Sequence, residues 1–115
     1  MAEKRNLKRR SFSYYMPVMD NTTQKVIGYL ADISPKGFRL DCKQPLPTGK
    51  AYQLRLELTG EVAVKPFMIV VAQAKWCRPD ELDPFVSNIG FELVNIDPED
   101  AAIFQRIVEK YSSGR

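Results

Sequence analysis

The chain alternates short runs of period-two hydrophobicity with turn-forming residues, and only its last stretch changes to a helical period. Successive side chains of a strand point to opposite faces, so this alternation predicts strands with one buried face. Clusters of Gly, Pro, Asn, Asp and Ser separate the runs and are typical of turns. The predicted strands cover residues 12–20, 25–33, 38–42, 52–58, 66–76 and 86–96.

The C-terminal stretch 98–111 is predicted to be a helix. Asp97 is a favourable N-cap residue, and Pro98 suits the first helical position because its missing N–H has no partner there. Apolar residues follow at a spacing that places them on one helix face, which predicts packing against a core. They are Ile103, Phe104, Ile107, Val108 and Tyr111.

Six short strands followed by one helix predict an all-β fold with one helix, namely a six-stranded antiparallel β-barrel plus a C-terminal α-helix. Closure removes exposed strand edges, and the helix can cover an open end. A chain of 115 residues suits a single domain. We expect a flexible basic arm over 1–11, because it holds too little apolar surface to offset its ordering entropy. The barrel domain then covers 12–115, with its helix at 98–111.

The composition argues against an enzyme. The chain contains no histidine, which excludes Ser-His-Asp and Cys-His catalysis and His-ligated zinc. Its two cysteines, Cys42 and Cys77, are too few for an all-cysteine zinc site and are interpreted as small buried hydrophobic residues. No glycine-rich phosphate loop and no obvious carboxylate pair are present. We therefore expect no catalytic residues, no metal and no cofactor.

The same features predict a cytoplasmic protein without membrane insertion. No apolar run approaches the length of a transmembrane helix. The basic N-terminus is not followed by the apolar segment of a secretory signal.

The positive charge is concentrated at the N-terminus. The first ten residues hold five basic side chains and one acidic one, whereas the other residues hold 12 basic and 13 acidic side chains. Such an arm suits an anionic partner, such as a phosphate, a nucleic acid or a membrane surface, although a solvated tail has the same composition. The basic residues are Lys4, Arg5, Lys8, Arg9 and Arg10.

Asp32, Ser34 and Gly37 lie between the predicted second and third strands. A carboxylate there can accept hydrogen bonds from guanine, a serine hydroxyl can reach a phosphate, and a glycine allows close backbone approach or a positive φ. Arginines of the arm can grip phosphates or the O6/N7 edge of guanine. An arm folded over this junction could therefore bind an anionic purine nucleotide. The alternative is an ordinary turn, in which Asp and Ser bond local N–H groups and Gly supplies a positive φ.

These features resemble the PilZ domain family, and the resemblance extends over nearly the whole chain. The segment Asp32-x-Ser34-x-x-Gly37 is similar to the family's [D/N]xSxxG motif between strands two and three. The segment Arg5-x-x-x-Arg9 is similar to its RxxxR motif before strand one. Both motifs stand in the order that the family requires.

Trp76 in the predicted fifth strand and Gly90-Phe91 in the last strand also resemble the family. The resemblance implies a six-stranded barrel with a C-terminal helix that binds the bacterial second messenger cyclic di-GMP and signals to an unidentified protein partner. Binding would order the arginine arm on the barrel. The ligand-binding residues that it implies are Arg5, Arg9, Arg10, Asp32, Ser34 and Gly37.

Two other functions stay open. If the adjacent pair Arg9-Arg10 begins the motif, its second arginine would fall at Ser13 or Tyr14, and neither is arginine. The chain would then resemble a degenerate PilZ domain that binds a protein partner without nucleotide. A basic-armed barrel that binds RNA or DNA is disfavoured, because the aromatic residues at 12, 14 and 15 follow a strand pattern instead of interleaving with the arm.

Overall fold

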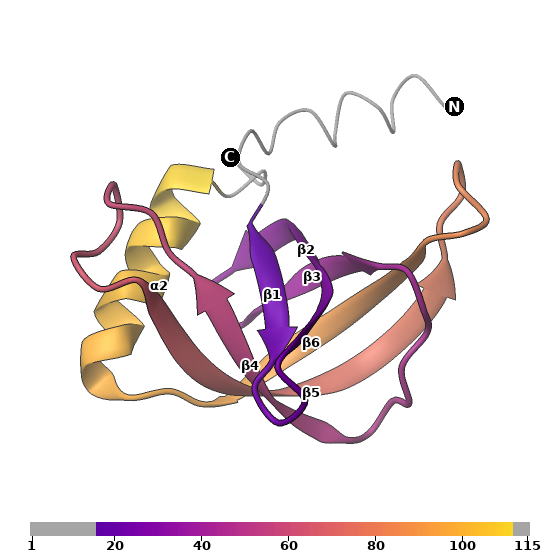
Figure 1. Cartoon of the computed structure of the whole chain (residues 1–115), viewed down its shortest axis with the longest axis horizontal. Coiled ribbons are helices and arrows are strands. Elements are labelled where there is room, and N and C mark those ends of the chain that lie inside the picture. Colours follow the sequence, from indigo (N-terminus) through magenta and orange to yellow (C-terminus); the bar gives the residue numbers. More distant parts are fainter. Residues whose placement is uncertain (1–15, 112–115) are drawn as a thin grey trace.

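The computed structural model of the chain describes residues 16–111, which form six β-strands and a C-terminal helix (Figure 1). This confirms the predicted fold class. The elements are β1 (Pro17–Asp20), β2 (Lys25–Ser34), β3 (Gly37–Cys42), β4 (Ala51–Glu57), β5 (Phe67–Pro79), β6 (Ser87–Asn95) and α2 (Pro98–Tyr111).

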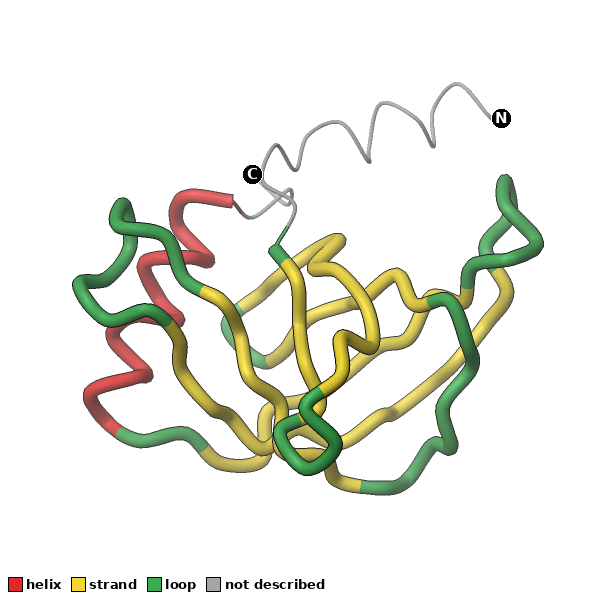
Figure 2. The backbone as a smooth tube through the Cα atoms, viewed as in Figure 1, coloured by secondary structure: helices red, strands yellow, loops and turns green. Residues whose placement is uncertain are grey.

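The strands form a closed antiparallel barrel in the order β1-β2-β3-β6-β5-β4 (Figure 2). The short strand β1 closes it, because Val18 lies opposite both Gly28 of β2 and Leu56 of β4. The backbone hydrogen bonds that a sheet edge would leave unpaired are thereby used within the barrel. The barrel supplies a continuous outer surface on which side chains from neighbouring strands stand in rows.

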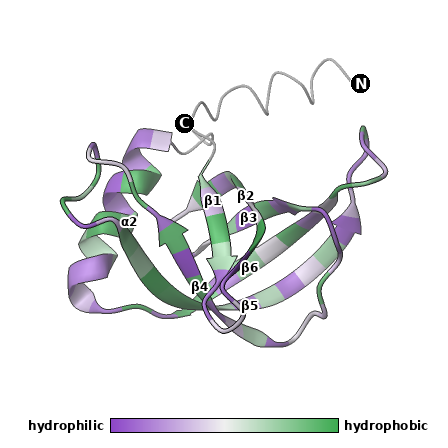
Figure 3. Ribbon diagram, viewed as in Figure 1, coloured by the Kyte–Doolittle hydropathy of each residue, from purple (hydrophilic) through white to green (hydrophobic). Residues whose placement is uncertain are grey.

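The core consists of the alternate residues that each strand directs into the barrel. In β4 the inward residues Leu54 and Leu56 are fully buried, whereas their neighbour Gln53 is exposed. The same alternation of apolar and polar residues is visible along the strands in Figure 3. The helix α2 lies across one end of the barrel (Figure 1) and directs its apolar stripe inward, so that the Phe104 ring lies 6.3 Å from that of Phe38.

Polar contacts also fix α2 to the loop between β4 and β5. Asp100, in the first turn of the helix, is buried and forms an ion pair with Lys65. This hydrogen bond raises the pKa of Lys65, as expected for an ammonium group beside a carboxylate. Further along the helix, Arg106 Nε donates to the carbonyl of Val62 at 2.9 Å. The predicted apolar face of the helix therefore packs against the core as expected, and charged side chains at the edge of that face bond the helix to the β4–β5 loop.

Most strand boundaries agree with the prediction within one residue, and among the described residues the largest difference lies at the end of β5. The fifth strand was predicted to end at residue 76, but β5 continues to Pro79, with Arg78 opposite Asn88 and Pro79 opposite Ser87. A proline is tolerated at the last position of a ladder because its missing N–H breaks no further pairing.

The first strand, β1, begins at Pro17. The predicted strand residues 12–15 and the predicted arm 1–11 lie outside the described residues.

The two cysteines are free thiols and differ in burial, since Cys42 is buried and Cys77 is half-buried. The interpretation as small buried hydrophobic residues is therefore confirmed for Cys42 and holds only in part for Cys77, which packs against the core while remaining half-buried. Burial, with smaller contributions from Asp41 and Cys77, raises the pKa of Cys42 to about 12.

We expect iodoacetamide at pH 8 to alkylate Cys42 at least about tenfold more slowly than Cys77 in the folded protein. The thiolate is the nucleophile, and burial disfavours it in Cys42 and also blocks access to the sulfur. Peptide mass spectrometry of samples quenched at several times measures both rates. Equal rates in the folded protein, or a difference that persists in denaturant, would contradict this explanation.

Candidate functional site

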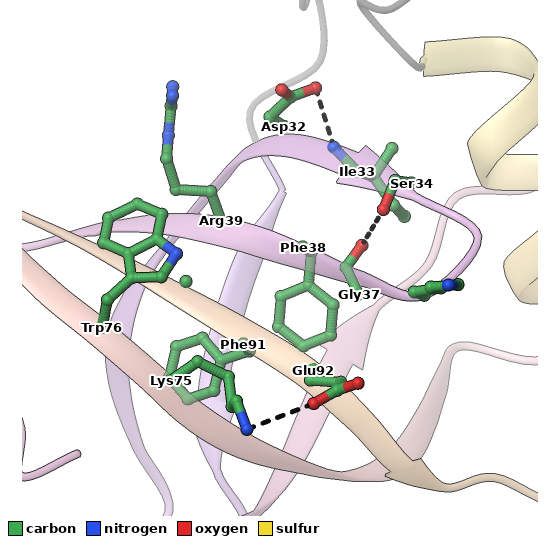
Figure 4. Close-up of a pocket in the computed structure, with 12 residues that line it drawn as sticks. Asp32, Ile33, Ser34, Gly37, Phe38, Arg39, Lys75, Trp76, Phe91 and Glu92 are labelled. Atoms are coloured by element: carbon green, nitrogen blue, oxygen red, sulfur yellow. Dashed lines mark hydrogen bonds and ion pairs between the residues drawn. The ribbon is translucent and has the colours of Figure 1, made fainter. Parts of the chain in front are cut away.

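A pocket of about 350 Å³ lies on the outer surface of β2, β3, β6 and β5, beside the β2–β3 turn (Figure 4). Asp32, Ser34 and Gly37 line it, so the structure brings together the three motif residues of the barrel. Trp76 from β5 and Gly90 from β6 line the same pocket. Residues more than 50 positions apart in the sequence therefore meet in one place.

Two of the motif residues make local hydrogen bonds. Asp32 Oδ1 accepts a hydrogen bond from the backbone N–H of Ile33 at 2.9 Å. The Ser34 hydroxyl donates to the carbonyl of Gly37 at 3.5 Å, which is long for such a bond. Ser34 is an exposed residue, and its hydroxyl is therefore only weakly engaged by the protein. Both side chains stabilise the turn and remain at the edge of the pocket.

Gly37 is required for close packing and not for a positive φ, which corrects one explanation of the turn. Within residues 16–111, positive φ values occur at Gln24 and Gly49 only. A Cβ atom on Gly37 would lie 2.0 Å from the carbonyl oxygen of Phe91, far inside van der Waals contact. The turn itself is bonded to β6, because Leu93 N donates to the Lys36 carbonyl at 2.8 Å.

A row of side chains crosses four neighbouring strands at the pocket. In the strand register, Asp32 of β2 lies opposite Arg39 of β3, Arg39 lies opposite Gly90 of β6, and Gly90 lies opposite Trp76 of β5. In Figure 4 the Arg39 side chain extends away from β3 between Asp32 and Trp76. The row thus places an acceptor, a donor and an aromatic ring next to one another.

Two irregularities in the ladder produce this row. The β2–β3 register shifts between Leu30 and Asp32, and the β5–β6 register shifts between Ala74 and Trp76. Each shift adds one residue to one strand, as in a β-bulge, and so changes the face to which later side chains point. The shifts direct Asp32 and Trp76 to the outer surface at the same level of the barrel.

Gly90 makes room for the Trp76 ring. A Cβ atom on Gly90 would lie 2.3 Å from Nε1 of the indole, so the ring occupies the space that any larger residue would need. The Arg78 guanidinium lies over the same ring, 4.5 Å from its centroid, in a cation–π arrangement. The indole therefore packs closely over Gly90, is also contacted by Arg78, and forms one wall of the pocket.

Arg39 has a buried Nε atom with no hydrogen-bond acceptor among residues 16–111. Leaving such a group unsatisfied costs about 1–3 kcal/mol, and native structures seldom leave one without a reason. Lys36 and Lys75 also line the pocket, and Lys75 pairs with Glu92 at 3.5 Å, where both side chains are half exposed. The pocket thus combines apolar walls with a surplus of positive charge.

The sequence motifs account for only part of this site. Arg5, Arg9 and Arg10, the three arginines of the predicted clamp, lie outside the described residues. Arg39 was not predicted, and neither were the two lysines that line the pocket. No spacing pattern identifies Arg39, because its neighbours come from three other strands and depend on two register shifts.

Other kinds of site find no support within residues 16–111. There, no three His, Cys, Asp or Glu side chains lie close enough together to hold a metal ion. In the same range no helix has the length and hydrophobicity to cross a membrane.

The described residues therefore define a small closed-barrel domain with one C-terminal helix, whose outer surface carries a tryptophan-walled pocket with a surplus of positive charge. The chain matches the family model described as PilZ domain over residues 3–110, which is nearly its whole length. It belongs to the PilZ domain family, a family of cyclic di-GMP receptors, and the predicted resemblance is confirmed. A search of curated proteins returned no match.

Proposed function

We propose that the chain is a non-enzymatic cyclic di-GMP receptor or adaptor that binds the dinucleotide in the pocket beside the β2–β3 turn. The row of Asp32, Arg39 and Trp76 across the barrel is the observation that supports this most strongly. The Asp32 carboxylate would accept hydrogen bonds from a guanine, and the Trp76 ring would offer it an apolar surface. Ser34 and the backbone at Gly37 would contact a phosphate.

The arginine arm would complete the site. Arg5 and Arg9, with Arg10 beside them, would hold phosphates and guanine edges through bidentate hydrogen bonds. This part of the proposal depends on the Arg5-x-x-x-Arg9 spacing. Ordering of the arm against the barrel on binding would create a new surface for a protein partner and so transmit the second-messenger signal.

A second candidate is a degenerate PilZ domain that binds a protein partner without nucleotide. It is favoured by the structural explanations that two motif residues already have. Asp32 bonds the Ile33 N–H, and Gly37 is required by its contact with Phe91. These residues would therefore be retained in a barrel that had lost its ligand.

Isothermal titration calorimetry of the full chain with cyclic di-GMP distinguishes the two candidates. We expect saturable heat with cyclic di-GMP and none with GTP at the same concentration. Absence of heat from cyclic di-GMP at high micromolar concentrations would favour the degenerate domain.

We expect Arg9→Ala and Asp32→Ala each to weaken cyclic di-GMP binding about tenfold or more. Each change removes charge-assisted hydrogen bonds that contribute roughly 1.5–3 kcal/mol. Lys25→Ala is the control, because Lys25 is an exposed residue at the far end of β2 and should leave the affinity unchanged. Binding by the unmodified chain should weaken as salt is raised. Full affinity in Arg9→Ala would exclude the Arg5/Arg9 clamp.

A further inference from the structure

We infer that Arg39 makes the pocket specific for guanine over adenine, an inference that rests on the proposed function of the same site. The starting observation is the buried Nε of Arg39, which has no acceptor among residues 16–111. Its side chain lines the pocket and extends between Asp32 and Trp76 (Figure 4). An unsatisfied donor in this position is satisfied when a ligand brings an acceptor to it.

The carboxylate of Asp32 beside Arg39 restricts which base can supply the acceptor. Asp32 stands opposite Arg39 in the strand register, so an acceptor group and a donor fork lie side by side. Guanine carries the complementary pair, because its O6 and N7 atoms accept hydrogen bonds while N1 and N2 beside them donate. The fork of an arginine matches the O6/N7 edge bidentately. Adenine presents an N6 donor where guanine has O6, so Arg39 would face another donor.

The far side of Arg39 supports the same orientation. Gly90 lies opposite Arg39 and has no side chain, and the Trp76 ring lies over it. An aromatic base that packs on this wall has its edge toward the strand that carries Arg39. Adenine would then leave the buried Nε of Arg39 without a partner. An unpaired buried polar group rejects a competing ligand more strongly than the loss of an apolar contact does.

Arg39→Met and Arg39→Lys test this role. Methionine keeps an unbranched stem without the guanidinium, and lysine keeps the positive charge without the fork. The probes are cyclic di-GMP and cyclic di-AMP, which carry the same phosphates and different bases, titrated into the full chain. We expect both variants to bind cyclic di-GMP about tenfold more weakly, with little change toward cyclic di-AMP, so that the preference for guanine falls.

Arg55→Met and Arg55→Lys are the matched controls. Arg55 is a half-buried arginine on β4, paired with Glu57 at 2.8 Å and placed over the Phe67 ring, and it does not line the pocket. These variants should keep both affinities. Thermal unfolding without ligand adds an independent measurement. A binding role predicts that Arg39→Met unfolds no earlier than the unmodified chain, because it removes a buried donor that has no acceptor among residues 16–111. A structural role predicts earlier unfolding.

The outcomes separate the two proposals. If the unmodified chain binds cyclic di-GMP and both Arg39 variants keep its affinity and base preference, the role of Arg39 is wrong and the proposed function stands. Arg39→Met could instead lose affinity equally for both dinucleotides while Arg39→Lys keeps full affinity. Arg39 would then act only as a positive charge that attracts the phosphates, and the inference would be overturned. No binding of cyclic di-GMP by the unmodified chain overturns both proposals.

Discussion

Gly37→Ala is expected to destabilise the fold by about 3 kcal/mol, at the upper end of what overpacking costs. The new methyl group would lie 2.0 Å from the Phe91 carbonyl and 3.0 Å from the Glu92 Cα, and both are backbone atoms of β6. A side chain can rotate away from such a clash, but a strand paired on both sides cannot. The β3–β6 ladder must therefore open locally or the turn must move.

Thermal unfolding followed by circular dichroism measures the effect. For a domain of this size we expect the midpoint to fall by about 10–20 °C. The control is Gly60→Ala in the β4–β5 loop, where a Cβ atom would meet no heavy atom within 4 Å. Coincident unfolding curves for the two variants would show that the contact with β6 is not tight. If the two curves coincided and Gly37→Ala still bound the ligand more weakly, the weaker binding could not be attributed to disrupted packing between the turn and β6.

Gly90→Ala is expected to move the Trp76 ring out of the pocket wall and to weaken cyclic di-GMP binding by about thirtyfold. Its Cβ atom would lie 2.3 Å from the indole, so the two cannot keep their places. Here the neighbour is a half-buried side chain, which can swing toward solvent. The fold should therefore survive, while the base loses an aromatic contact of the kind that contributes about 1–3 kcal/mol.

The displacement can be observed directly, because Trp76 is the single tryptophan of the chain. We expect its fluorescence emission to shift to longer wavelength in Gly90→Ala, and calorimetry to give the loss of affinity. The thermal midpoint should fall less than in Gly37→Ala. Gly60→Ala should change none of these quantities. Unchanged emission with unchanged affinity would mean that the wall tolerates the methyl group and that Trp76 is not held by Gly90.

The two glycines show how differently one residue type can act at a site. Gly37 belongs to the sequence motif and was predicted to serve the ligand, yet its surroundings give it a structural reason that needs no ligand. Gly90 lies outside the motif, and its surroundings connect it with the tryptophan of the pocket. Binding experiments on Gly37 variants therefore report chiefly on folding, whereas Gly90 variants report on the pocket.

The sequence by itself determined the element order and the fold class. Strand alternation and helical periodicity reflect which side chains face the core, and each is a property of a few consecutive residues. For the same reason the amino-acid pattern alone locates the turn with Asp32, Ser34 and Gly37 between the second and third strands. The boundary of β5 was missed, because pairing with β6 extends it through residues of poor strand propensity such as Pro79.

Only the tertiary structure decided which side chains stand beside that turn. The four residues Asp32, Arg39, Gly90 and Trp76 form a row because the β2–β3 register shifts before Asp32 and the β5–β6 register shifts before Trp76. Such a shift moves every later side chain to the other face, and nothing in the local sequence pattern specifies it. The burial of the Arg39 Nε without an acceptor among residues 16–111 is likewise a property of the folded barrel and not of the local sequence. Local pattern therefore determined the strands, and long-range register determined the pocket.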